Sequence, residues 1–142
     1  MEVSEVRRRL RAAIEKARET AAERRTRSDQ AARDYETFLT ERAVPVFHQF
    51  AAALTGEGHP FKVFTPAGAV RLASDRSPEE FIELSLDTTV DPPEVLARIS
   101  HGRGRRALTS ERPVAGRTQI AFLSEEHVLD LLLEEAPAFL QR

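Results

Sequence analysis

The segment from residue 101 to residue 106 has the residue types best suited to binding chemistry. It reads His-Gly-Arg-Gly-Arg-Arg, so an imidazole and three guanidinium groups flank two glycines that let a ligand approach the backbone. Arginine side chains bind phosphate and carboxylate oxygens through paired hydrogen bonds. The segment is therefore a candidate site for an anion or a protein partner, and the candidate residues are His101, Arg103, Arg105 and Arg106.

The same segment has two further interpretations. Its glycine spacing matches a variant of the dinucleotide-binding fingerprint, but that fingerprint needs a helix directly after the glycines. Strand-forming residues and then Pro113 follow here, which argues against a dinucleotide site. A solvated tight turn, whose glycines supply positive φ angles, explains the segment without any ligand. We favour this turn over contact with an anion or a partner.

Histidines and carboxylates elsewhere in the chain form no recognisable catalytic or metal-binding motif. His127, Asp130 and Glu134 share one face of a predicted helix, at spacings that can present metal ligands. However, no His-Glu-x-x-His or Glu-x-x-His string occurs, and the chain has no cysteine. The polar outer face of an amphipathic helix gives the same spacing. We therefore expect neither a metal ion nor a cofactor, and we do not favour an enzyme.

Composition and charge argue against several classes of protein. The chain has 142 residues, 41% of them hydrophobic, with no cysteine and no recognisable signal peptide. No apolar run approaches the roughly 18 residues that a membrane span needs, so we expect a soluble cytoplasmic protein without disulfides. The net charge of −2 divides into +4 over residues 1–33, −7 over 34–97, +5 over 98–117 and −4 over 118–142. Nucleic-acid-binding domains usually carry a basic excess overall, so nucleic acid is not the favoured partner.

Residues 4 to about 54 are predicted to form a long helix with Ser4 as its N-cap. Pro45 either kinks this helix or starts a second one. Apolar residues recur at spacings of three and four near both ends, but the stretch 18–30 has only two alanines and must face solvent or a partner. The second apolar stripe begins at Ala32 in a shifted frame, which requires a four-residue stutter. The residues expected to make an oligomer are Val3, Val6, Leu10, Ala17, Tyr35, Phe38 and Leu39.

The apolar period changes from helical to alternating after Gly56. Strand-like stretches, the first of them a hairpin around a Pro-Ala-Gly turn, lie at residues 61–72, 82–87, 95–101 and 106–112. The Asp-Pro-Pro-Glu string at 91–94 is also a fair helix start, but we prefer strand there. Ser124 is predicted to cap the final helix. The expected fold class is α+β: a long N-terminal helix, an antiparallel β-meander of four to five strands, and a C-terminal amphipathic helix.

The predicted N-terminal helix is longer than the domain it serves. A 40-residue helix spans about 60 Å, whereas a 100-residue domain has a radius of gyration of about 13 Å. We therefore divide the chain into an extended oligomerisation helix, residues 1–40, and a compact domain, residues 41–142. A monomer with a solvated, salt-bridged helix is the competing interpretation.

We predict a non-enzymatic interaction protein. In this prediction the helix makes a homodimer, and the sheet or the hairpin tip presents a surface to a protein partner, as in a scaffold or adaptor. The alternative is a nucleic-acid-binding protein that uses the Arg-rich helix and the Arg-rich hairpin tip. Phosphate contacts weaken steeply with salt, so the two functions differ in a measurable way.

Overall fold

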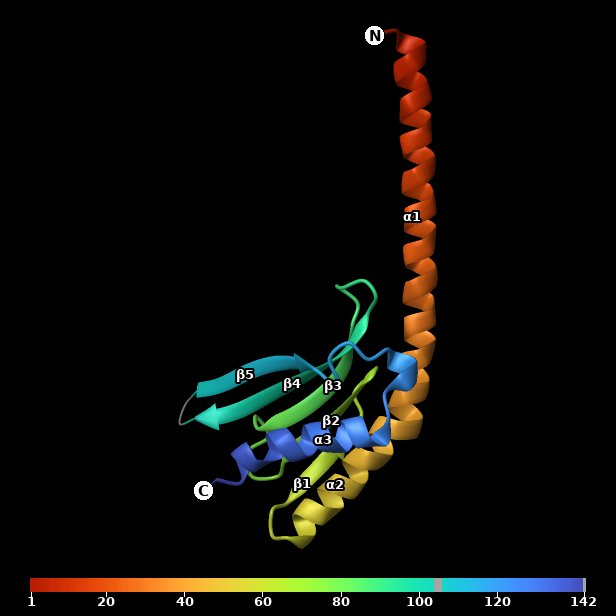
Figure 1. Ribbon diagram of the computed structural model, residues 1–142. Helices are drawn as coiled ribbons and strands as arrows, with labels where there is room; N and C mark the ends of the chain where they lie inside the picture. The colour runs from red at the N-terminus through yellow and green to blue at the C-terminus, as the bar shows by residue number, and fades with distance from the viewer. Residues whose placement is uncertain (104–105, 142) are drawn as a thin grey trace.

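The chain folds into a two-layer α+β domain with a long helical arm (Figure 1). The computed structural model describes residues 1–103 and 106–141. Five strands form one antiparallel sheet in the order β1-β2-β3-β4-β5, so each strand pairs with its neighbour in sequence. The strands are β1 (Phe61–Phe64), β2 (Ala69–Ser74), β3 (Phe81–Asp87), β4 (Glu94–Arg103) and β5 (Arg106–Pro113). This arrangement confirms the predicted fold class.

The N-terminal helix is continuous but changes direction near Pro45. It consists of α1 (Val3–Phe38), a π-helical turn η1 (Leu39–Ala43) and α2 (Val44–Gly56). Proline has no N–H, and its ring clashes with the carbonyl four residues earlier, so the wider π turn lets the chain continue through Pro45. The predicted cap is wrong, because Glu2 occupies the N-cap position without a side-chain hydrogen bond and Ser4 lies inside the helix.

The C-terminal helix α3 (Glu125–Glu135) begins at a side-chain cap. The backbone N–H of His127 donates to Ser124 Oγ at 3.3 Å, and the backbone N–H of Ser124 donates to His127 Nδ1 at 3.0 Å. This reciprocal capping box satisfies two N–H groups that the first turn of a helix leaves unpaired. Two short 3-10 helices flank α3: η2 (Ile120–Phe122) and η3 (Ala136–Phe139).

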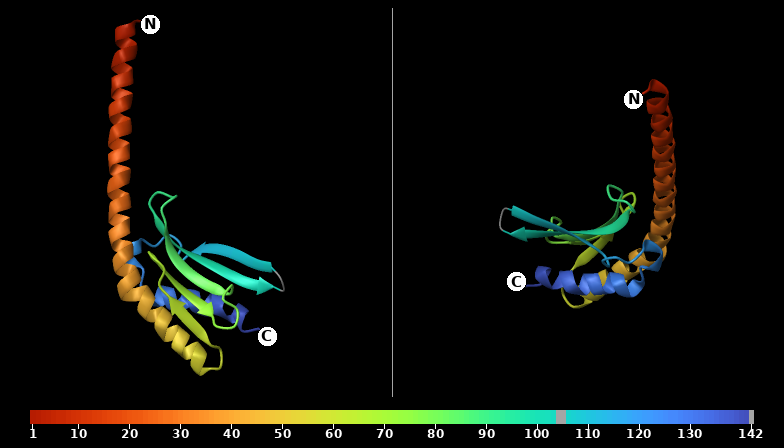
Figure 2. Two further views of the ribbon diagram at one scale, coloured as in Figure 1. Left: turned by 180° about the vertical axis from the view of Figure 1, so that it is seen from behind. Right: turned by 45° about the horizontal axis from the view of Figure 1, so that its top comes forward.

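The core lies between one face of the sheet and the helices α2 and α3, as Figure 2 shows from two sides. The alternating strand residues Ile82, Leu84 and Ile99 point into it, and Leu131 and Leu132 of α3 meet them from the other layer. This alternation explains why residues 94–103 form a strand despite the helix-start string at 91–94. Within the described residues, no helix is both long enough and apolar enough to cross a membrane.

Candidate interaction surface

The first 25 residues of α1, Val3 to Arg27, form an arm that stands away from the domain (Figure 2). All of them are exposed except Glu5, which is half-buried beside its ion pairs with Arg8 and Arg9. The first residue of α1 that the domain buries is Ala31. At 1.5 Å per residue the arm is about 37 Å long, so it exposes a helix surface that the rest of the chain does not cover.

One side of the arm is apolar. Its large members, among them Val3 at 75% exposed and Leu10 at 56%, are followed by small ones toward the domain. Eighteen residues make about five turns of helix, so Ala21 lies in line with Val3, and Ser28 lies in line with Leu10. We name this side the arm stripe, and it consists of Val3, Val6, Leu10, Ile14, Ala17 and Ala21.

Part of the predicted oligomerisation face lies elsewhere. Tyr35 and Phe38 are buried in the core of the same chain, and Leu39 packs against that core. Their side chains therefore already have partners, which limits the free stripe to the arm. Ala31 is buried and Ala32 is exposed, so the second apolar stripe begins one residue earlier than expected.

An ion pair holds the base of the arm. The Arg27 guanidinium donates through Nε and Nη2 to the two carboxylate oxygens of Asp91, at 3.0 and 2.7 Å, and Arg24 lies 3.9 Å from the same carboxylate. The hydrogen bond from Arg27 is the main cause that lowers the pKa of Asp91. Because Asp91 lies in the β3–β4 loop, this pair ties the arm to the sheet just above the first buried residue of α1.

A second contact holds α1 nearer its C-terminal end, where Tyr35 meets the turn between β1 and β2. The Tyr35 hydroxyl donates a 2.5 Å hydrogen bond to the carbonyl oxygen of Gly68, in the turn between β1 and β2. Burial is the main cause that raises the pKa of Tyr35 well above its usual range. Gly68 has a φ of 73°, a conformation that glycine adopts easily. The aromatic ring is thus a structural anchor and leaves no hydroxyl free for a ligand.

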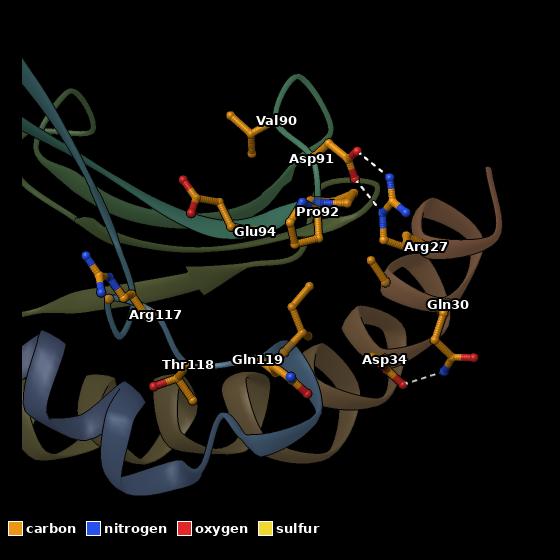
Figure 3. A pocket seen from close by; sticks show the side chains of 14 residues that line it. Arg27, Gln30, Asp34, Val90, Asp91, Pro92, Glu94, Arg117, Thr118 and Gln119 are labelled. Atoms are coloured by element: carbon orange, nitrogen blue, oxygen red, sulfur yellow. Dashed lines mark hydrogen bonds and ion pairs between the residues drawn. The ribbon is translucent and has the colours of Figure 1, made fainter. Parts of the chain in front are cut away.

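Two hollows flank the ion pair at the base of the arm. The larger, about 520 Å³, is shown in Figure 3, and the apolar residues Ala31, Pro92 and Ile120 are among those that line it. Its rim carries both signs of charge, with Arg27 and Asp91 on one side and Glu94 and Arg117 on the other. No Ser, His, Cys or Lys is among its described lining residues. Its only lining hydroxyl among them is that of Thr118, and its carboxylates are those of Asp34, Asp91 and Glu94.

The smaller hollow, about 330 Å³, lies between the arm and the β3–β4 loop. Ala21 and Ser28 belong to its arm side, and Val90 and Pro93 belong to its loop side. Ala21 is a member of the arm stripe and Ser28 is in line with Leu10, so the arm stripe runs directly into this hollow. Val90 adds an exposed apolar side chain at the same point.

The sheet face opposite α2 and α3 carries a charged cluster. Glu83 of β3 lies 3.3 Å from Arg71 and 3.0 Å from Arg98, so it pairs with arginines on both neighbouring strands. The Arg71 guanidinium also lies 4.0 Å from the centre of the Phe81 ring. Cation–π contacts of this kind hold a guanidinium flat on an aromatic ring. This face is therefore ordered by its own side chains and is not covered by a helix (Figure 2).

The β4–β5 hairpin extends away from the arm (Figure 1). The backbones of Arg103 and Arg106 pair across the two strands, and the Arg106 side chain is exposed. Arg105 lies outside the described residues. The His101 ring stacks on Phe139 with ring centres 4.4 Å apart, so it packs against the C-terminal end of the domain. The structure therefore brings Arg103 and Arg106 together and gives His101 a packing contact.

Two of the residues considered as metal ligands, His127 and Glu134, make contacts that stabilise the fold. His127 uses its ring nitrogen in the capping box of α3, as described above. Glu134 binds Arg112 of β5 at 2.7 Å. Among the residues that the structure describes, no group of three or more His, Cys, Asp or Glu side chains is placed to hold a metal ion.

Sequence reasoning missed two parts of the interaction surface. Ile14 belongs to the arm stripe, and it could have been found from its spacing of four after Leu10. Asp91 was considered only as part of a possible helix start, and no sequence signal links it to Arg27, 64 positions away. No protein-family model, no curated protein and no solved structure matches this chain.

Proposed function

We propose that this protein is a non-enzymatic interaction protein that forms a homodimer through its arm, as a scaffold or adaptor would. The observation that carries the proposal is the arm stripe, an apolar surface on a helix that its own domain leaves uncovered. Val3, Val6, Leu10 and Ile14 are all exposed there. Contiguous apolar surface on a soluble protein usually marks an interaction site.

Helix energetics support the same proposal. In proteins most of the stability of a helix comes from packing its apolar face, and short isolated helices are marginal in water. The ion pairs of Glu5 with Arg8 and Arg9 lie on the surface, where each is worth only a few tenths of a kcal/mol. A second copy that covers the arm stripe supplies the packing that the domain does not.

The uncovered sheet face is the second part of the proposal. We assign it the role of the surface that meets a protein partner once the arms have paired. The Arg71, Glu83 and Arg98 cluster is held in place before binding, and Phe64 at the edge strand β1 is exposed beside it. Arginine and aromatic side chains are enriched in the centres of protein interfaces, which fits this role.

Sedimentation equilibrium of the full chain, with a matched pair of variants, tests the dimer. Leu10 and Leu133 are exposed to almost the same extent, 56% and 54%, but Leu10 lies on the arm stripe and Leu133 on the outer side of α3. Leu10→Asp should raise the dimer dissociation constant by about a hundredfold or more, since each copy would bury a charge. Leu133→Asp should leave it within about threefold. A native chain that remains monomeric at high micromolar concentration contradicts the proposal.

A second candidate function is nucleic-acid binding, and one observation favours it. Residues 7–11 of the arm include four exposed arginines within five positions. An electrophoretic shift measured at about 50 mM and 200 mM salt separates the candidates, because phosphate contacts lose a large factor in affinity over that range. Salt-sensitive binding by the native chain that persists in Leu10→Asp would favour nucleic acid over the dimeric scaffold.

A further inference from the structure

We infer that the two arms pair antiparallel, so that the far end of each arm seats in the smaller hollow at the base of the other. This inference rests on the proposed dimer and specifies its geometry. The occupant of the arm stripe is then a second copy of this chain in one defined direction. Three features of the arm support it independently: side-chain size, charge order, and the hollow itself.

Side-chain size changes systematically along the arm stripe. Its far half has Val3, Leu10 and Ile14, whereas its near half has Ala17 and Ala21 and leads to Ser28. In an antiparallel pair Ile14 faces Ala17, Leu10 faces Ala21 and Val3 faces Ser28. These three large side chains each meet a small one, whereas Val6 lies at the level of Arg25. Facing large and small residues interdigitate well. A parallel pair would set large against large at one end and small against small at the other.

Charge order also distinguishes the two directions. Residues 1–6 carry net −2 and residues 7–11 carry net +4. Nearer the domain, residues 19–23 carry net −2 and residues 24–27 carry net +3. An antiparallel pair brings each block beside a block of opposite sign. A parallel pair aligns every block with its own copy, so that like charges repel along the whole arm.

The smaller hollow supplies an end point for the antiparallel pair, with apolar lining at Ala21, Val90 and Pro93 and charged lining at Arg24, Arg25 and Asp91. Val3 of one copy reaches the level of Ser28 of the other, and the side chains of Ser28, Ala21 and Val90 line that hollow. The ion pair of Arg27 with Asp91 lies next to it and keeps the β3–β4 loop against the arm. We call this smaller hollow the seat. It is formed by the arm and the β3–β4 loop of one chain, and the far end of the other chain's arm fills it.

Disulfide trapping tests the direction, because the chain has no cysteine of its own. Leu10→Cys and Ala21→Cys variants are mixed in equal amounts and equilibrated in a glutathione redox buffer, and intact mass identifies each cross-linked species. The antiparallel pair joins the two variants to each other. Each variant alone should remain uncross-linked, since like positions are then about 16 Å apart along the axis, beyond disulfide reach.

The control outcomes separate this inference from the proposed function. Leu10→Cys and Ala21→Cys variants that each cross-link to themselves, and not to each other, show a parallel dimer, which overturns the direction and leaves the dimer intact. A dimer by sedimentation with neither cross-link overturns the inferred pairing of Leu10 with Ala21 and with it the seat, and a monomer overturns both the inference and the proposed dimer. For the seat, Val90→Asp should weaken the dimer about tenfold, while the same substitution at the exposed Phe122, away from the hollow, should change it less than about threefold. Equal effects of the two substitutions would contradict the seat.

Discussion

The arm and the C-terminal helix α3 use the same apolar spacing and reach opposite outcomes. Helix α3 has only 11 residues, yet Val128, Leu131 and Leu132 are almost fully buried against the sheet. The arm is more than twice as long and exposes Val3, Val6 and Leu10. The difference lies in what is within reach: the N-cap of α3 directly follows Leu123, whose carbonyl accepts a hydrogen bond from Arg42 of η1 inside the domain, whereas the arm extends past the last contact that the sheet offers. An apolar stripe predicts that a helix face will be covered, and the rest of the fold decides by what.

The largest expected effect belongs to α3. Leu132→Ala should lower the free energy of unfolding by about 2–5 kcal/mol, because the side chain is fully buried and its loss leaves a cavity. Chemical denaturation monitored by circular dichroism measures the change. Leu10→Ala on the arm is the comparison, and at concentrations where the chain is monomeric it should cost less than about 0.5 kcal/mol. A cost below about 1 kcal/mol for Leu132→Ala would make α3 as peripheral as the arm.

The next effect lies where the arm joins the domain. Tyr35→Phe should lower the free energy of unfolding by about 0.5–1.5 kcal/mol, because the hydrogen bond between the Tyr35 hydroxyl and the carbonyl of Gly68 is lost. The folded-state pKa of Tyr35 is raised above its unfolded value. The contribution of this tyrosine to stability is therefore fully present below about pH 10 and is lost as pH rises beyond it. Denaturation at pH 8 and pH 11 checks this, and Tyr35→Phe should show a smaller alkaline loss than the native chain. Equal losses would contradict the role of the buried hydroxyl.

A smaller effect concerns the ion pair at the base of the arm. Because Arg27 lowers the folded-state pKa of Asp91, the pair contributes stability above the ordinary Asp pKa, and that contribution is lost as pH falls through the folded value. A carboxyl titration by NMR should give Asp91 a pKa below the ordinary value of about 3.9. Arg27→Ala should return it toward that value. An Asp91 pKa unchanged by Arg27→Ala would mean that the loop does not hold the arm.

The smallest effect on stability is expected at the hairpin tip. Replacing Arg103, Arg105 and Arg106 with Ser should change the free energy of unfolding by less than about 0.5 kcal/mol, as ordinary surface substitutions do. Thermal unfolding of the triple variant measures this. A loss above about 1 kcal/mol would show that the arginines balance charges inside the domain, in which case they would not be available to a partner.

The sequence predicted the fold class because its strands and helices have clear periods. Alternation at Ile82, Leu84 and then Val95, Ala97 and Ile99 identified the strands, and Ser124 identified the start of α3. The same reasoning failed at Tyr35 and Phe38, which it placed on the oligomerisation face. Helical spacing predicts which residues share one face of a helix, but not what packs against that face. Here the core of the same chain packs against Tyr35 and Phe38. The ion pair of Arg27 with Asp91 forms only because the folded sheet brings the distant β3–β4 loop to the arm. Local sequence therefore could not predict this ion pair.

Hydrogen exchange as a function of protein concentration tests the central claim most directly. The claim is that the domain is stable by itself, whereas the arm is covered by a second copy. Amides of residues 8–20 should exchange quickly at low micromolar concentration and become strongly protected as the dimer forms. Amides of β3 and β4 should be equally protected throughout, since their protection comes from the core of a single chain. Arm amides whose exchange does not depend on concentration would contradict the account.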